Sequence, residues 1–264
     1  MAEPQATGRA TGAPVPPGAL GGAASGHRSP AARSRRVLAW AACAGGLAAY
    51  NWWVLVPLKP GLMTSPSELF SNLEVSGQPY ASVMQHLDML SGLLLLGAFL
   101  ATGRRSLPAG RRDWLAMIVF SAAGLAGGVF PEVCADGVNA LCRREEWHFQ
   151  LPAGQYVHMV AGIVEFAAIT VALFAAMRRT RASQALTARV YRRLWLGALV
   201  CYPLLGLAYL LNRMGGVMEG VFFIGFTVMV ITQVAERTSR LGRPRADSIS
   251  RARADCQPCG AVSS

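Results

Sequence analysis

Charged residues are scarce in this sequence, and lysine is almost absent. Charged residues make up 15% of the 264 residues, 53% are hydrophobic, and arginine outnumbers lysine 24 to 1. The hydrophobic residues gather in long runs, and the charged residues are too few to cover one water-soluble core that buries all of those runs. The composition therefore excludes an ordinary soluble globular domain and indicates a membrane protein.

Several motifs of common enzyme classes are also absent. The sequence has no Walker phosphate-binding loop, no GxSxG nucleophile motif, no HExxH metalloprotease motif and no GxGxxG dinucleotide fingerprint. These absences remove the usual sequence signals of nucleotide-dependent and hydrolytic enzymes. On the sequence alone we favour a protein that is not an enzyme.

Six hydrophobic runs have the length of membrane spans. A helix needs about 20 apolar residues to cross the hydrocarbon core of a bilayer. We expect spans at residues 37–58, 82–102, 114–130, 155–177, 194–211 and 217–235. The predicted fold is all-α, an integral membrane bundle of six helices. Its transmembrane domain covers residues 37–236, between disordered basic tails at residues 1–36 and 237–264.

Arginine is concentrated in alternate connections between the predicted spans. The N-terminal segment, the second and fourth connections and the C-terminal tail are rich in arginine, whereas the other connections hold only Lys59, Arg143, Arg144 and Arg213. Basic residues accumulate on the cytoplasmic side of membrane proteins, so we predict that both termini are cytoplasmic. The net charge of +11 then reflects topology and attraction to anionic lipid headgroups, not nucleic-acid binding. The GC-rich coding that this composition implies predicts a bacterial plasma membrane.

A few ionisable side chains lie inside the predicted spans and gather near the outer surface. Asp88 is in the second span, His158 in the fourth and Glu219 in the sixth, and Glu165 lies about 10 Å deeper than His158 along its helix. Ionisable residues within a membrane commonly mark binding or transport sites. We predict a ligand-binding or proton site in a polar cavity open to the outside. The alternative is that these side chains only fix helix packing.

His86 and Asp88 raise the separate question of a metal site. Side chains two residues apart on a helix are separated by about 200° of rotation around its axis. His86 and Asp88 therefore cannot face the same small site unless the helix is irregular. We expect Asp88 to point inward and His86 to point to a helix interface or to the headgroup layer. If the helix is irregular, His86, Asp88 and His158 would bind zinc, and Glu165 or Glu219 would act on zinc-bound water.

The connection after the third span holds two cysteines, Cys134 and Cys142. On the external side they face an oxidising compartment, and they are close enough in sequence to bond, so we predict a disulfide. The disulfide would hold a loop with Glu132, Asp136 and His148 above the cavity.

The first external connection contains the stretch TSPSELFSNL. Ser65 suits a helix N-cap, Pro66 the first helical position and Glu68 the third, which together form a capping box. We predict a short helix whose apolar residues lie on the membrane surface or over the bundle. Those residues are Leu69, Phe70 and Leu73.

Four short motifs resemble those of a known family. They are LDMLSGLLLL in the second span, FPEVCADG after the third, HMVAGIVEF in the fourth and GGVMEGVFF at the start of the sixth. Together they resemble the domain-of-unknown-function-998 family of small bacterial multi-span proteins. The resemblance implies a membrane fold and gives Asp88, Asp136, His158 and Glu219 as recurring polar positions. It implies no particular activity.

The sequence therefore predicts a multi-pass plasma-membrane protein that binds or transports a small molecule or a lipid through an outward-facing polar cavity. Two alternatives stay open. One is a zinc-dependent membrane hydrolase with its site near the outer leaflet. The other is a structural subunit of a membrane complex. The expected partners are a bilayer with anionic headgroups and a small-molecule or lipid ligand, and no nucleic acid.

Overall fold

The computed structural model describes residues 29–58, 63, 69–103, 110–135, 139–183, 185–211 and 214–241. The regular elements of these residues are all helices, which confirms the all-α prediction. Seven are α-helices: α1 (Pro30–Tyr50), α2 (Ala81–Thr102), α3 (Arg111–Val129), α4 (Ala140–Trp147), α5 (Ala153–Thr180), α6 (Leu186–Leu210) and α7 (Gly215–Ser239). Two short 3-10 helices follow α1 and precede α2, namely η1 (Trp52–Leu58) and η2 (Phe70–Glu74).

Each predicted span contains one of the six long helices, but α1 ends at Tyr50 and the last part of the first predicted span forms η1 instead. Helix α4 is short and lies in the connection after α3. Among the described residues, three helices are long and apolar enough to cross a membrane, namely α2, α5 and α7. The other long helices, α1, α3 and α6, each begin with an arginine-rich stretch, which lowers their mean hydropathy. The fold is thus a helical assembly with the character of a membrane protein.

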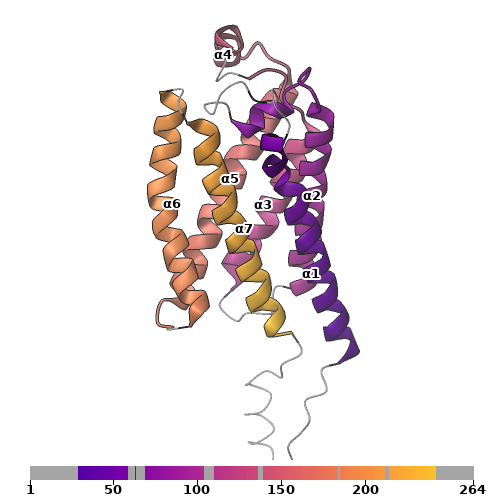
Figure 1. The fold of residues 1–264 in the computed structure, drawn as a ribbon. Coiled ribbons are helices and arrows are strands. Elements are labelled where there is room, and N and C mark those ends of the chain that lie inside the picture. The colour runs from indigo at the N-terminus through magenta and orange to yellow at the C-terminus, as the bar shows by residue number, and fades with distance from the viewer. Residues whose placement is uncertain are drawn as a thin grey trace, which may run out of the picture.

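The long helices run side by side, as Figure 1 shows. Helix α4 lies at one end of the assembly, which we call the α4 end. Helix α1 begins and helix α7 ends at the opposite end, which we call the terminal end. Helices α1, α2, α3, α5 and α7 enclose most of the core. Its fully buried members include Leu95, Phe99, Met117, Ala172 and Val230. Helix α6 packs against α5 and α7 at the edge of the bundle.

The first helix starts earlier than the sequence predicts. Ser29 caps it by accepting a hydrogen bond from Ala32 N–H, and Pro30 is the first helical residue. The expected boundary between tail and bundle at residue 36 therefore lies inside α1. Arg36 donates a hydrogen bond of 2.8 Å to the Thr238 carbonyl oxygen, which ties the start of α1 to the end of α7.

The short helix expected in the first external connection is only partly visible. Its capping residues, Ser65, Pro66 and Glu68, lie outside the described residues. The part that is described forms the 3-10 helix η2. Leu73 of η2 is buried and packs with Trp52 of η1 and with Met84 at the start of α2, so this segment lies over the bundle.

Two glycines set the distance between α2 and α3. A Cβ added at Gly92 would lie 2.5 Å from the Leu125 backbone nitrogen, and one added at Gly128 would lie 2.8 Å from the Met89 backbone nitrogen. Backbone atoms in regular helices cannot move aside singly, so both positions require a residue without a side chain. The close packing fixes the part of α2 that carries Asp88.

Buried ion pairs join α3, α5 and α7 at the terminal end. Asp113 is 1% exposed and accepts hydrogen bonds of 2.9 Å from Arg237 and from Arg179. Arg237 is fully buried and also donates to the Gly110 carbonyl oxygen at 2.9 Å. Arg179 contacts Glu236 at 2.6 Å through its other terminal nitrogen. Asp113 thus neutralises both Arg237 and Arg179. Glu236 contacts Arg179 as well.

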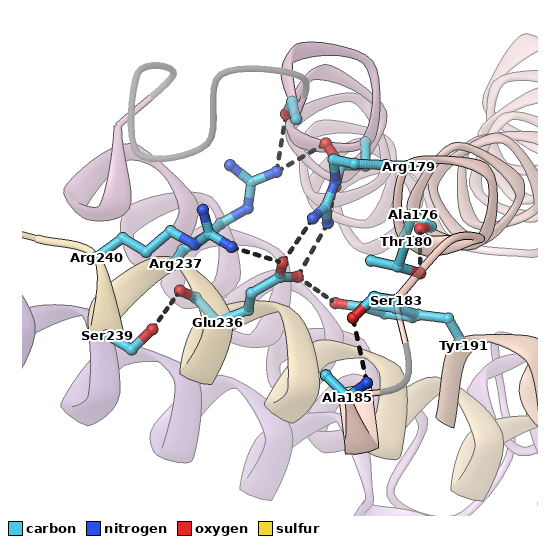
Figure 2. Close-up of polar contacts among 12 residues, drawn as sticks. Ala176, Arg179, Thr180, Ser183, Ala185, Tyr191, Glu236, Arg237, Ser239 and Arg240 are labelled. Atoms are coloured by element: carbon cyan, nitrogen blue, oxygen red, sulfur yellow. Dashed lines mark hydrogen bonds and ion pairs between the residues drawn. The ribbon is translucent and has the colours of Figure 1, made fainter. Parts of the chain in front are cut away.

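Helix α6 joins this network through a tyrosine. Figure 2 shows Arg179, Tyr191 and Arg240 approaching Glu236 from different sides. The Tyr191 hydroxyl, which is fully buried, donates to Glu236 at 3.2 Å. Arg240 is about half exposed and lies 4.0 Å from the same carboxylate. The network is therefore buried at Asp113 and Arg237 and reaches solvent at Arg240.

Candidate functional site

A polar cavity of about 250 Å³ lies among α2, α3, α5 and α7, on the side of the bundle nearer the α4 end. Five carboxylic acids line it: Glu74, Asp88, Glu132, Glu165 and Glu219. His158 also lines it, whereas no lysine or arginine does among the described residues. Aromatic rings form much of the remaining wall: Tyr50, Trp52, Phe166, Phe222 and Phe223. The cavity is therefore acidic and partly aromatic.

The structure places all four predicted ligand-binding or proton-site residues on this cavity. They come from three helices: Asp88 from α2, His158 and Glu165 from α5, and Glu219 from α7. His86 lies on the opposite, exposed face of α2, where its Nδ1 contacts the carbonyl oxygen of Ser82. The helix is regular, so the rotation of about 200° between residues 86 and 88 separates the two side chains as expected.

The predicted zinc-ligand set is consequently not assembled. His86 faces away from the cavity that Asp88 and His158 share. Within the described ranges, no group of three or more histidine, cysteine, aspartate or glutamate side chains is placed to hold a metal ion. The zinc hypothesis required an irregular α2, and α2 is regular from Ala81 to Thr102.

Asp88 is held by two neighbours from the segment between α1 and α2. The Trp52 indole N–H donates a hydrogen bond of 3.1 Å to Asp88. The position of Trp52 at the end of a predicted span would otherwise be typical of an interfacial anchor. The Glu74 carboxyl group also hydrogen-bonds Asp88. Burial raises the pKa of Glu74 well above its ordinary value of 4.5, and the nearby charges of Asp88, Glu219 and Glu132 raise it further. Glu74 is therefore the neutral member of the pair and donates its proton to Asp88.

The raised pKa of Glu74 predicts a specific pH dependence of stability. Above pH 4.5 the unfolded chain loses the Glu74 proton while the folded chain keeps it, so stability falls as pH rises toward the folded pKa. The slope from this one group reaches at most about 1.4 kcal/mol per pH unit. Glu74→Gln keeps a hydrogen-bond donor for Asp88 and does not titrate. Its thermal unfolding midpoint in detergent should fall less between about pH 5 and pH 8 than that of the wild type.

The control for this measurement is Glu145→Gln on α4, which should keep the wild-type slope. Asp88, Glu132 and Glu219 are the other acids that face Glu74, and they are present in all three proteins. A Glu74→Gln variant with the same slope as the wild type would contradict the assignment of a neutral Glu74.

Glu219 positions the segment that carries Glu74. Its carboxylate is 8% exposed and accepts a hydrogen bond from the Phe70 N–H at the start of η2. The ring of Phe70 and the ring of Trp53 pack against α7 at the next residue, where a Cβ on Gly220 would lie 3.5 Å from Trp53 and 3.6 Å from Phe70. Glu219 therefore acts as a cap for η2 and holds η2 over the cavity.

Glycines of α3 make room for the deepest acid. A Cβ at Gly124 would lie 3.1 Å from Glu165 Oε1, and one at Gly127 would lie 3.9 Å from the same atom. His158, about two turns before Glu165 on α5, is oriented by α3 as well. His158 Nδ1 lies 3.0 Å from the carbonyl oxygens of Gly127 and Phe130, so it carries a hydrogen and donates to them. This leaves Nε2 as the ring atom for a ligand or water.

The loop after α3 is fixed at two points. A disulfide joins Cys134 to Cys142 of α4, with the two Cα atoms 6.0 Å apart. Gln155 of α5 accepts a hydrogen bond of 2.8 Å from Val133 N–H. These contacts hold Glu132 at the cavity. His148, at the end of α4, is exposed and is not part of the cavity wall, and Asp136 lies outside the described residues.

A family model described as "Protein of unknown function (DUF998)" matches residues 42–236. The chain belongs to this family. The match includes every residue that lines the acidic cavity, from Tyr50 to Phe223. No curated protein matches the chain, and neither does any solved structure. Three of the polar positions that the resemblance to the DUF998 family implies, Asp88, His158 and Glu219, line the cavity together.

Sequence reasoning gave no role in the site to Glu74 or Trp52. Both lie in the connection between the first two spans, where an acid or a tryptophan is unremarkable in a membrane protein. The available local signal was the short helix predicted with Leu69, Phe70 and Leu73, because Glu74 directly follows Leu73 where this connection folds back over the bundle. The Glu74–Asp88 contact depends on that fold, which no periodic pattern encodes.

Proposed function

We propose that this protein is a multi-pass membrane protein that binds a small organic cation in the acidic cavity. The observation that carries the proposal is the convergence of five carboxylic acids without an opposing lysine or arginine among the described lining residues. Uncompensated carboxylates in a site of low dielectric constant favour a positively charged ligand. The ring faces of Trp52, Tyr50 and the neighbouring phenylalanines add the cation–π attraction that suits an ammonium group.

The volume of the cavity supports a small ligand. At about 250 Å³ it lies below the range of roughly 300–1,000 Å³ that is usual for drug-sized molecules. An ammonium group with a few carbon atoms suits this space. The neutral Glu74 beside Asp88 provides a proton that a bound cation would displace, so we expect cation binding to weaken at low pH.

We further propose that the chain spans the membrane six times and that the α4 end is external. The arginines at the starts of α1, α3 and α6 support a cytoplasmic terminal end by the positive-inside rule. The disulfide between Cys134 and Cys142 supports an oxidising environment at the α4 end. In this orientation the cavity takes its ligand from outside a bacterial plasma membrane.

Gly162 offers a direct test of cation binding. It lines the cavity, and a Cβ built there meets no atom within 4 Å, so a leucine can fill the space without a backbone clash. Tetramethylammonium should raise the thermal unfolding midpoint of the wild-type protein in detergent by mass action. In Gly162→Leu that shift should disappear while the midpoint without ligand stays close to the wild-type value.

Gly97→Leu is the matched control, because Gly97 is also helical and unobstructed but does not line the cavity. It should respond to tetramethylammonium like the wild type. The neutral analogue tert-butanol, which has a similar shape, should shift none of the three proteins. If tetramethylammonium and a series of small primary amines leave the wild type unchanged, the cation proposal fails and a purely structural role becomes the better account.

A further inference from the structure

A second cavity lies on the other side of α7, in the groove between α5, α6 and α7. Its volume is about 300 Å³ and its wall is apolar, apart from Arg193 and Tyr202 of α6. Phe222 and Ile169 line both cavities and so separate them. The groove follows α6 from Arg193 to Tyr202, about 13 Å at the helical rise.

The groove opens onto an apolar surface formed by α6. Helix α6 lies at the edge of the bundle in Figure 1. Large aliphatic side chains of α6 are exposed. These include Leu196, Leu199, Val200, Leu204 and Leu207. In a bilayer this surface is surrounded by acyl chains, so the groove is accessible to them and not to water.

The groove exists because two positions lack side chains. A Cβ on Gly197 would meet no atom within 4 Å, and one on Gly225 would meet only Leu194 Cδ2, at 4.0 Å. The space in front of Gly197 is therefore open groove and not packed protein. An acyl chain that entered it from the bilayer would fill the open space and gain van der Waals contacts with the apolar wall.

The groove ends at exposed positive charge. Arg193 lies at its end nearer the start of α6, and Arg189 and Arg192 are exposed on the same helix, toward the terminal end. No ion pair joins any of the three to another described residue. Glu236, which contacts Tyr191 of α6, is already neutralised by Arg179.

We propose that this groove binds one acyl chain of an anionic phospholipid of the cytoplasmic leaflet, with the lipid phosphate at Arg193. The apolar wall accepts the chain, and the arginines provide the complementary charge for the headgroup. The inference rests on the membrane location of the chain and is independent of cation binding in the acidic cavity.

Lipid titration followed by native mass spectrometry tests this site on the full-length protein. Wild-type protein, Gly197→Phe, Arg193→Gln and Gly206→Phe are each titrated with phosphatidylglycerol and phosphatidylcholine of equal chain length. In the wild type we expect phosphatidylglycerol to bind more tightly than phosphatidylcholine. Gly197→Phe fills the groove and should lose both lipids. Arg193→Gln should weaken phosphatidylglycerol binding about fivefold and phosphatidylcholine binding little.

Gly206→Phe is the matched control, since Gly206 is on α6, is equally unobstructed and lies outside the groove. It should bind both lipids like the wild type. Equal binding of the two lipids to the wild type, or full phosphatidylglycerol binding by Gly197→Phe, would overturn the proposal. If Gly197→Phe does not fold, an unchanged lipid preference in Arg193→Gln overturns it as well. The tetramethylammonium response, measured on the same samples, reports separately on the acidic cavity.

Discussion

Asp113→Asn is expected to destabilise the protein by about 3–5 kcal/mol, because it removes the buried carboxylate charge that faces Arg237 and Arg179. Asp113 contacts both Arg237 and Arg179 at 2.9 Å. Asparagine has nearly the same shape, so packing is preserved and the loss is electrostatic. The thermal unfolding midpoint in mild detergent, followed by circular dichroism, measures the effect.

Two further variants separate burial from charge at this site. Arg240→Ala removes the half-exposed partner of Glu236 at 4.0 Å and should cost less than about 1 kcal/mol, as exposed ion pairs do. Asp113→Leu combined with Arg237→Met removes both buried charges and should be less destabilising than Asp113→Asn. If Asp113→Asn and Arg240→Ala have equal, small effects, the buried network does not stabilise the terminal end.

Gly92→Ala should cost roughly 1–3 kcal/mol and should also abolish the response to tetramethylammonium. The added Cβ would lie 2.5 Å from the Leu125 nitrogen and 2.8 Å from the Ser121 carbonyl oxygen, so α2 and α3 must separate. The separation moves the turn of α2 that carries Asp88, one turn from Gly92. The thermal midpoint and its shift with ligand, measured in one titration, test both effects.

Gly97→Ala on the same helix is the control for the Gly92 substitution. A Cβ on Gly97 meets no atom within 4 Å, so the change should stabilise the helix by about 0.5–1 kcal/mol through lower backbone entropy in the unfolded chain. A Gly92→Ala variant that is as stable as Gly97→Ala would show that α2 and α3 tolerate a wider spacing than this packing implies.

The positions of the cavity residues along their helices could be predicted from the sequence. Span position and helical rise give the depth of a side chain, and this is why Asp88, His158 and Glu219 could be expected at one level with Glu165 deeper. Helical rotation likewise separates His86 from Asp88. These are properties of single helices, and the cavity follows once the helices pack side by side.

The ion-pair network at the terminal end could not be predicted in the same way. Arg179 and Arg237 lie near span ends, where arginine is explained equally well by membrane topology. Asp113 and Glu236 are acids at the same boundary, 66 and 57 residues away from Arg179. Which of these charges pair depends on helix neighbours and not on any local pattern. The one sequence signal available for this network was that two acids, Asp113 and Glu236, lie among the arginines near the span ends.

The difference in depth between the outer acids and Glu165 has an electrical consequence. In the proposed six-span orientation, a cation that moves from Asp88 to Glu165 crosses part of the membrane, and with it part of the transmembrane voltage. Crossing the whole membrane is worth about 2.3 kcal/mol per charge at 100 mV. With the α4 end outside, a voltage that is negative inside draws the cation toward Glu165, so occupancy of the cavity should increase as the membrane becomes more polarised.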